Sequence, residues 1–81
     1  MNTVTRTPQQ LGQSLKARRA KLQLSQTEVG AKVGMKQNTV SVLEISTSSS
    51  SVESLFKVIS ALGLELVVRE KSKSPSSSQE W

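Results

Sequence analysis

The sequence predicts a small all-α fold with one short C-terminal strand. Apolar residues recur at helical spacing in four segments between residues 7 and 62, whereas residues 64–69 alternate between apolar and polar side chains. At 81 residues the chain has room for one small hydrophobic core, which gives only marginal stability by itself. We therefore expect one domain that forms a homodimer, with residues 7–69 folded between a flexible N-terminus (1–6) and a disordered tail (70–81).

The composition argues against catalysis and metal binding, because the chain has no His, Cys, Asp or Tyr. Metal sites are built mainly from Cys, His and carboxylates, and general acid–base chemistry uses His, carboxylates or Tyr. Of these types only six scattered Glu remain, so we expect no enzyme, no metal and no cofactor. A chain without cysteine is compatible with a reducing cytosol. Its start is polar, unlike a signal peptide, and no apolar run approaches membrane-spanning length. We expect a cytoplasmic, nucleoid-associated protein without a membrane partner.

The net charge of +5 is confined to one half of the chain. Residues 1–50 carry seven Lys or Arg against two Glu, whereas residues 51–81 carry four against four. A basic half is the electrostatic pattern typical of a nucleic-acid-binding domain, although by itself it is equally often a solvated surface.

The first helix is predicted to begin at Pro8 and to end near Lys21 or Leu22. Thr7 can cap it, and proline suits the first helical position, where its missing N–H is not needed. Leucines recur along this segment at helical spacing and should face the core: Leu11, Leu15 and Leu22.

Residues 25–44 hold two short helical patterns joined by a turn at Gly34. Ser25 can cap the first pattern, and Glu28 three residues later completes a capping box. Gly34 can adopt the left-handed conformation that ends a helix. The apolar positions should form the scaffold: Val29, Val33, Val40 and Leu43. Two helices joined by so short a turn are typical of a helix-turn-helix, which presents its second helix to the DNA major groove.

A fourth helix should follow the polar loop at residues 46–51, capped by Ser50 with Glu53 and ended by Gly63. Its broad apolar face should comprise Val52, Leu55, Phe56, Ile59 and Leu62.

The segment at residues 64–69 is the predicted strand. A lone strand leaves its backbone groups unpaired, so we expect it to pair with the same strand of a second copy. The apolar residues assigned to this dimer strand are Leu64, Leu66, Val67 and Val68. The alternative is a frayed, extended C-terminal segment.

The start of the second helix of the motif carries the candidates for reading DNA bases. Gln and Asn pair with adenine through both amide atoms, Ser reads several bases, and Lys reaches guanine. The candidate base contacts are therefore Lys36, Gln37, Asn38 and Ser41. The alternative is that they are ordinary exposed polar residues.

Phosphate contacts would strengthen binding without reading sequence. Gln26, at the first position of the first helix of the motif, could bind a phosphate there or brace Gln37. The other candidates are Thr27, Thr39, Arg18 and Lys32.

Residues 11–62 resemble the Cro/C1-type (Xre-family) helix-turn-helix domain. The resemblance is carried by Leu24-Ser25-Gln26, Glu28-Val29, Val33-Gly34-Met35, Gln37-Asn38-Thr39-Val40-Ser41 and Glu44. It implies a lambda-repressor-like fold in which Arg19 pairs with Glu44 as a structural contact. The departures from the family include Gln23, which stands where glycine often ends the first helix, and Val42, where a polar residue often faces DNA.

A narrower resemblance is to the HipB antitoxins. It is carried by residues 34–41, by the strand that directly follows the fourth helix, and by a polar tail ending in Gln79-Glu80-Trp81. It implies a dimer that binds a palindromic operator, represses its own operon and neutralises a HipA-like serine/threonine kinase toxin. Trp81 would dock on the kinase. The alternatives are a stand-alone repressor of the same fold and a protein-interaction module that has lost DNA binding.

Overall fold

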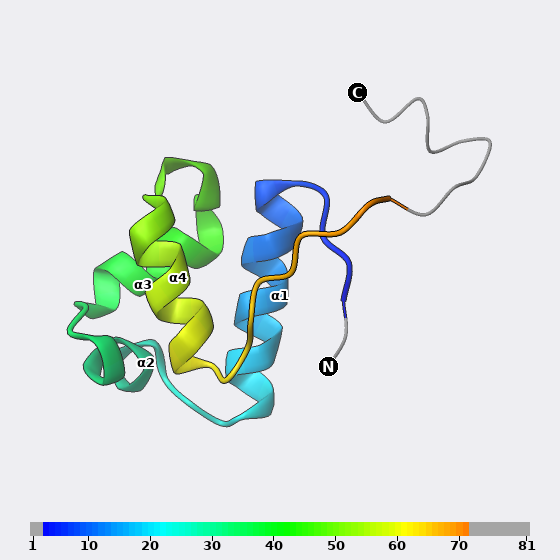
Figure 1. Cartoon of the computed structure of the whole chain (residues 1–81). Helices are drawn as coiled ribbons and strands as arrows, with labels where there is room; N and C mark the ends of the chain where they lie inside the picture. Colours follow the sequence, from blue (N-terminus) through cyan, green and yellow to red (C-terminus); the bar gives the residue numbers. More distant parts are fainter. Residues whose placement is uncertain (1–2, 72–81) are drawn as a thin grey trace.

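The structure, a computed structural model, describes residues 3–71. Its helices are α1 (Pro8–Lys21), α2 (Gln26–Val33), α3 (Gln37–Ile45) and α4 (Val52–Ala61), with a short 3-10 helix, η1 (Thr47–Ser49), between α3 and α4. Figure 1 shows α2, α3 and α4 grouped beside α1. The predicted all-α helix-turn-helix fold is confirmed.

Side-chain caps define where most of the helices begin. The Thr7 hydroxyl accepts from the Gln10 N–H at the start of α1, and Ser25 and Glu28 form the predicted capping box at α2. The predicted capping box of Ser50 and Glu53 is wrong. The Ser50 N–H instead closes η1 on the Thr47 carbonyl, so α4 begins one residue later and is capped by Ser51.

One hydrophobic core lies between the helices. Seven apolar side chains from the four α-helices and the C-cap of α4 are buried: Leu15, Val29, Val40, Leu43, Val58, Ile59 and Leu62. Leu11 and Val33 are half-buried. The apolar pattern therefore identified most of the core but missed Val58.

Three predicted core residues are exposed: Leu22, Val52 and Phe56. Leu22 is the C-cap of α1. It lies beyond the last helical residue, so the helical spacing that places Leu15 in the core does not apply to it. Val52 is the first residue of α4, and Phe56 lies one turn further along. The broad apolar face of α4 is thus only partly covered by residues 3–71.

Gly12 marks a close approach that the sequence did not reveal. It is buried in α1, and a Cβ added there would collide with the Thr47 hydroxyl and the Glu44 carbonyl oxygen. Thr47 is itself buried, and its hydroxyl donates to the Leu43 carbonyl at 2.6 Å. Only glycine lets α1 pack this closely against the end of α3.

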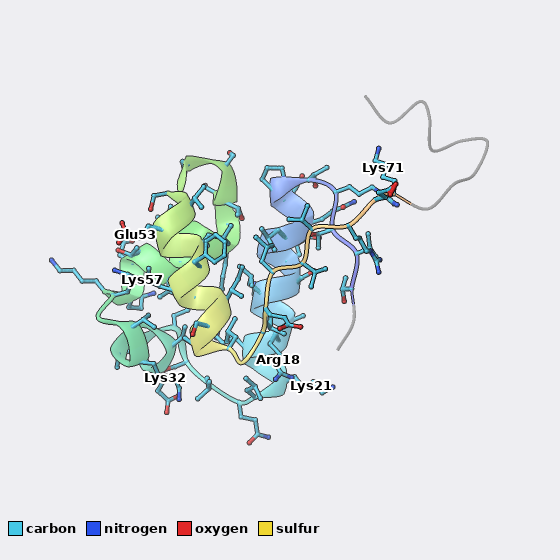
Figure 2. All side chains as sticks on the ribbon, viewed as in Figure 1. Arg18, Lys21, Lys32, Glu53, Lys57 and Lys71 are labelled. Carbon is cyan, nitrogen blue, oxygen red and sulfur yellow. The ribbon has the colours of Figure 1, made fainter. Side chains whose placement is uncertain are left out.

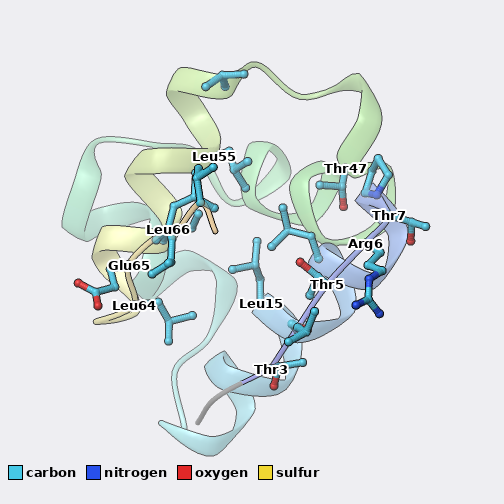
Figure 3. A pocket seen from close by; sticks show the side chains of 18 of the residues that line it. Thr3, Thr5, Arg6, Thr7, Leu15, Thr47, Leu55, Leu64, Glu65 and Leu66 are labelled. Atoms are coloured by element: carbon cyan, nitrogen blue, oxygen red, sulfur yellow. The ribbon is translucent and has the colours of Figure 1, made fainter. Parts of the chain in front are cut away.

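Residues 64–71 have no regular secondary structure within this single chain. Leu64 packs against the core, whereas Leu66, Val67 and Val68 are exposed. The segment lines one side of a groove whose other side includes Thr3 and Thr5, with Leu15 between the two sides (Figure 3). Pairing with a second copy stays a prediction, and the predicted docking residue Trp81 lies outside the described residues.

Candidate nucleic-acid interface

The turn between α2 and α3 is built by local interactions. Gly34 adopts the left-handed conformation, with φ 71°, and ends α2 as predicted. The Met35 N–H then donates to the Gly30 carbonyl at 2.8 Å. Lys36 is the N-cap of α3, and no side chain caps that helix. The first turn of α3 therefore lies close to α2, and no side chain caps the N-terminal end of α3.

A chain of hydrogen bonds connects α1, α2 and α3. Arg19 of α1 donates to both carboxylate oxygens of Glu44 on α3, at 2.6 and 3.1 Å. The same Glu44 accepts from the side-chain amide of Gln26, at 3.1 Å. The Gln26 oxygen in turn accepts from the Gln37 amide at 2.5 Å. The side chain of Gln37, the first residue of α3, is therefore held by Gln26, and Gln26 is held by the ion pair of Arg19 and Glu44.

The ion pair at the base of this network is well enclosed. The Glu44 side chain is 1% exposed and that of Arg19 is 16% exposed. Its hydrogen bond with Glu44 raises the pKa of Arg19 above the ordinary value. A third donor of Arg19 reaches the Leu24 carbonyl at 3.0 Å, which ties the α1–α2 loop to the same centre. Paired in this way, the buried carboxylate can orient Gln26 without carrying an unsatisfied charge.

The four candidate base contacts lie around the start of α3: Lys36 is its N-cap, and Gln37, Asn38 and Ser41 belong to the helix. Lys36, Gln37 and Asn38 are exposed and Ser41 is half-buried. Gln37 is the only one of the four for which a side-chain hydrogen bond within residues 3–71 is identified. The predicted group is thus brought together on one helix.

The candidate phosphate contacts are less uniform. Thr27, Lys32 and Thr39 are exposed on α2 and α3, and Gln26 is half-buried. Arg18 instead donates from Nε to the Leu62 carbonyl at 3.0 Å, at the C-terminal end of α4. Figure 2 places Arg18 and Lys21 near the end of α1, apart from Lys32 on α2. Arg18 therefore has a structural contact, and its phosphate contact stays a prediction.

The sequence did not reveal that Gln26 bonds Glu44, nor that Ile45 is exposed on α3 beside Val42. The helical spacing of Val42 and Ile45 relative to buried Val40 and Leu43 could have indicated the second feature.

Residues 3–71 contain neither a candidate metal site nor a candidate membrane-spanning helix. No group of three or more His, Cys, Asp or Glu side chains comes together there in a way that could hold a metal ion. In the same part of the chain, no helix is long and apolar enough to cross a membrane.

Comparison with protein families matches this chain to the helix-turn-helix family over residues 15–68. Among characterised proteins, it is 30% identical over 74 residues to Antitoxin HipB of Escherichia coli K12, which covers 90% of this chain and 84% of that protein. It is also 30% identical to Antitoxin HipB of Escherichia coli O6:H1, covering 79% of that protein.

Solved structures with the same arrangement include two complexes of HipB. A complex of a HipB variant with an O2 20mer superimposes with a TM-score of 0.84 at 25% identity, covering 89% of this chain and 100% of that one. A complex of HipA, HipB, O2 and O3 gives the same TM-score and identity, covering 88% of this chain.

Proposed function

This chain belongs to the HipB antitoxins of the helix-turn-helix family, and on that premise we propose that it is a sequence-specific DNA-binding antitoxin. In this proposal a homodimer binds a palindromic operator and represses its own operon. It also binds and neutralises a HipA-like serine/threonine kinase toxin. It acts by binding and not by catalysis, in the cytoplasm and on nucleoid DNA.

The observation that carries DNA binding is the hydrogen bond between Gln26 and Gln37 at the start of the two motif helices. A side chain that reads a base edge must be held in one orientation, because bidentate pairing requires fixed geometry. The bond to Gln26, itself held by Glu44, supplies that constraint. Asn38 and Ser41 lie near Gln37 on the same helix and Lys36 is its N-cap, so these three are the proposed companions in base readout.

Phosphate contacts are proposed for the exposed polar side chains around this group, namely Thr27, Lys32 and Thr39, with Gln26 and Arg18 as further candidates. The positive charge of residues 1–50 supports this assignment. Two-fold symmetry would set the two recognition helices about 34 Å apart, or a multiple of that distance, so that both meet the major groove on one side of the duplex.

A gel-shift assay with the promoter DNA of its own operon tests the DNA-binding part. We expect sequence-specific binding that weakens as salt rises and is abolished by Gln37→Ala together with Ser41→Ala. Gln9→Ala and Ser48→Ala are matched controls at exposed positions outside α2 and α3, and both should bind normally. Absent or salt-insensitive binding would favour a protein-interaction module that has lost DNA binding.

The toxin partner is supported by the solved complex that contains HipA together with HipB. We propose that Trp81 docks on the kinase, because tryptophan is enriched at binding hot spots. The test is purification of the full-length protein from its native host, compared with a form that lacks residues 70–81. A HipA-like kinase should accompany the full-length protein. If none does, a stand-alone repressor is the better description.

A further inference from the structure

The recognition helix α3 exposes apolar side chains on its outer face. Val42 is 38% exposed and Ile45 is 72% exposed, whereas Val40 and Leu43 of the same helix are fully buried. Asn38, Val42 and Ile45 follow one another at spacings of four and three residues, so they share one face of the helix. That face points away from the core and includes one of the proposed base contacts.

These apolar side chains are not what a solvated helix face requires. Nothing in residues 3–71 buries Ile45, and Val42 is only partly covered. The surface is continuous with the polar group formed by the N-cap Lys36 and by Gln37, Asn38 and Ser41 of α3. A partner for this face must therefore offer both hydrogen-bonding groups and an apolar group at close range.

The DNA major groove offers this combination. Its base edges carry hydrogen-bond donors and acceptors, and its one apolar group is the 5-methyl of thymine, which proteins read by apolar contact. We propose that Val42 reads a thymine 5-methyl group in each half-site, one turn beyond Asn38, with Ile45 extending the apolar surface beside it. This inference rests on the proposed DNA-binding function and adds a specificity determinant to it.

The expected effect is modest but measurable. Burial of one methylene-sized group contributes about 0.8 kcal/mol, which corresponds to about a three- to fourfold change in affinity. Loss of the contact in both half-sites of a palindrome should therefore weaken binding by about tenfold. Val42→Ala should leave the fold intact, because the side chain is partly exposed and alanine is the better helix former.

The test uses a duplex that the full-length protein selects from a random library. Each thymine is replaced in turn, symmetrically in both half-sites, by uracil, which lacks only the methyl group. One replacement should weaken wild-type binding by about tenfold. Val42→Ala should bind the thymine duplex about tenfold more weakly than wild type and show no further loss with uracil at that position.

Two controls separate this inference from the function on which it rests. Val4→Ala removes the same atoms from an exposed valine outside α2 and α3 and should leave the uracil response unchanged. If no thymine loses its effect in Val42→Ala while Gln37→Ala together with Ser41→Ala still abolishes binding, the methyl contact is refuted and DNA binding stands. If Val42→Ala instead weakens only kinase binding, the face belongs to a protein partner. If wild type selects no sequence, both proposals fail.

Discussion

The side-chain amide of Gln37 donates a hydrogen bond to the side-chain oxygen of Gln26, at 2.5 Å, and each residue is the first of its helix. The bond therefore joins the starts of α2 and α3 at the surface where DNA is proposed to bind. Gln26 is held from the other side by Glu44, which is buried and paired with Arg19. The position of an exposed side chain thus depends on an ion pair inside the fold.

This dependence predicts that Gln26 affects DNA affinity through Gln37. Gln26→Ala removes the acceptor that orients Gln37, and a hydrogen bond of this kind contributes about 0.5–1.5 kcal/mol. We expect operator affinity to fall by up to about tenfold in a gel shift, whereas adding Gln26→Ala to a Gln37→Ala variant should cause little further loss. Fully additive losses in the double variant would show that the two glutamines act independently.

The ion pair itself should dominate the stability of the motif. Glu44→Ala leaves the Arg19 guanidinium without its buried partner, and such a change costs about 3–5 kcal/mol. The loss should lie at the lower end, because Arg19 is partly exposed and keeps its bond to the Leu24 carbonyl. Urea denaturation measures the change.

Glu53→Ala is the matched control for that measurement. Its side chain is 82% exposed, and its oxygen lies 3.9 Å from Lys57 Nζ. An exposed pair of this kind contributes about 0.5 kcal/mol or less. Equal losses for the two glutamate variants would mean that the buried network does not stabilise the domain.

The loop between α1 and α2 contains a residue in an unfavourable conformation. Gln23 has φ 58°, and it is the one residue other than glycine among residues 3–71 with positive φ. The left-handed conformation costs an L-residue about 1–2 kcal/mol, and glycine avoids this penalty. Part of that gain is lost because glycine has more conformational freedom in the unfolded chain. Gln23→Gly should therefore raise Tm by a few degrees.

Gln13→Gly is the paired control for Gln23→Gly. Gln13 lies inside α1, where glycine costs up to about 1 kcal/mol relative to a good helix former. The same substitution should therefore lower Tm there. If both variants lower Tm, the conformation of Gln23 is not a source of strain.

The capping box of α2 should make stability depend on pH. The backbone N–H of Ser25, followed by its hydroxyl, lowers the pKa of Glu28 below its usual value of 4.5. A carboxylate with a lowered folded-state pKa contributes stability that is present above pH 4.5 and is lost as pH falls through the lower, folded-state pKa. The stability difference between wild type and Glu28→Gln, followed by urea denaturation, should shrink on acidification below pH 4.5. A difference that stays constant between pH 7 and pH 3 would contradict this assignment.

Local signals explain which parts of the structure could be predicted from sequence. Three predicted features are confirmed: the cap at Ser25, the left-handed Gly34 and the burial of Val40 and Leu43. Each depends on residues only a few positions apart in the sequence. The bond from Gln26 to Glu44 depends on how α2 packs against α3, which no local pattern encodes. Spacing alone also does not say how much of a broad apolar face is covered, and for this reason the exposure of Phe56 was missed.

The segment after α4 supports a final prediction about assembly. Leu66, Val67 and Val68 are exposed in the single chain, and we expect residues 64–69 to pair as strands across a homodimer. Proline at position 67 removes a backbone N–H and disrupts strand pairing, so Val67→Pro should shift the protein towards monomer in analytical ultracentrifugation. Val67→Ala keeps that N–H, so it should dimerise more strongly than Val67→Pro and closer to wild type. If Val67→Pro remains as dimeric as wild type, the interface lies elsewhere, and the exposed side chains of Val52 and Phe56 on α4 become the surface to test next.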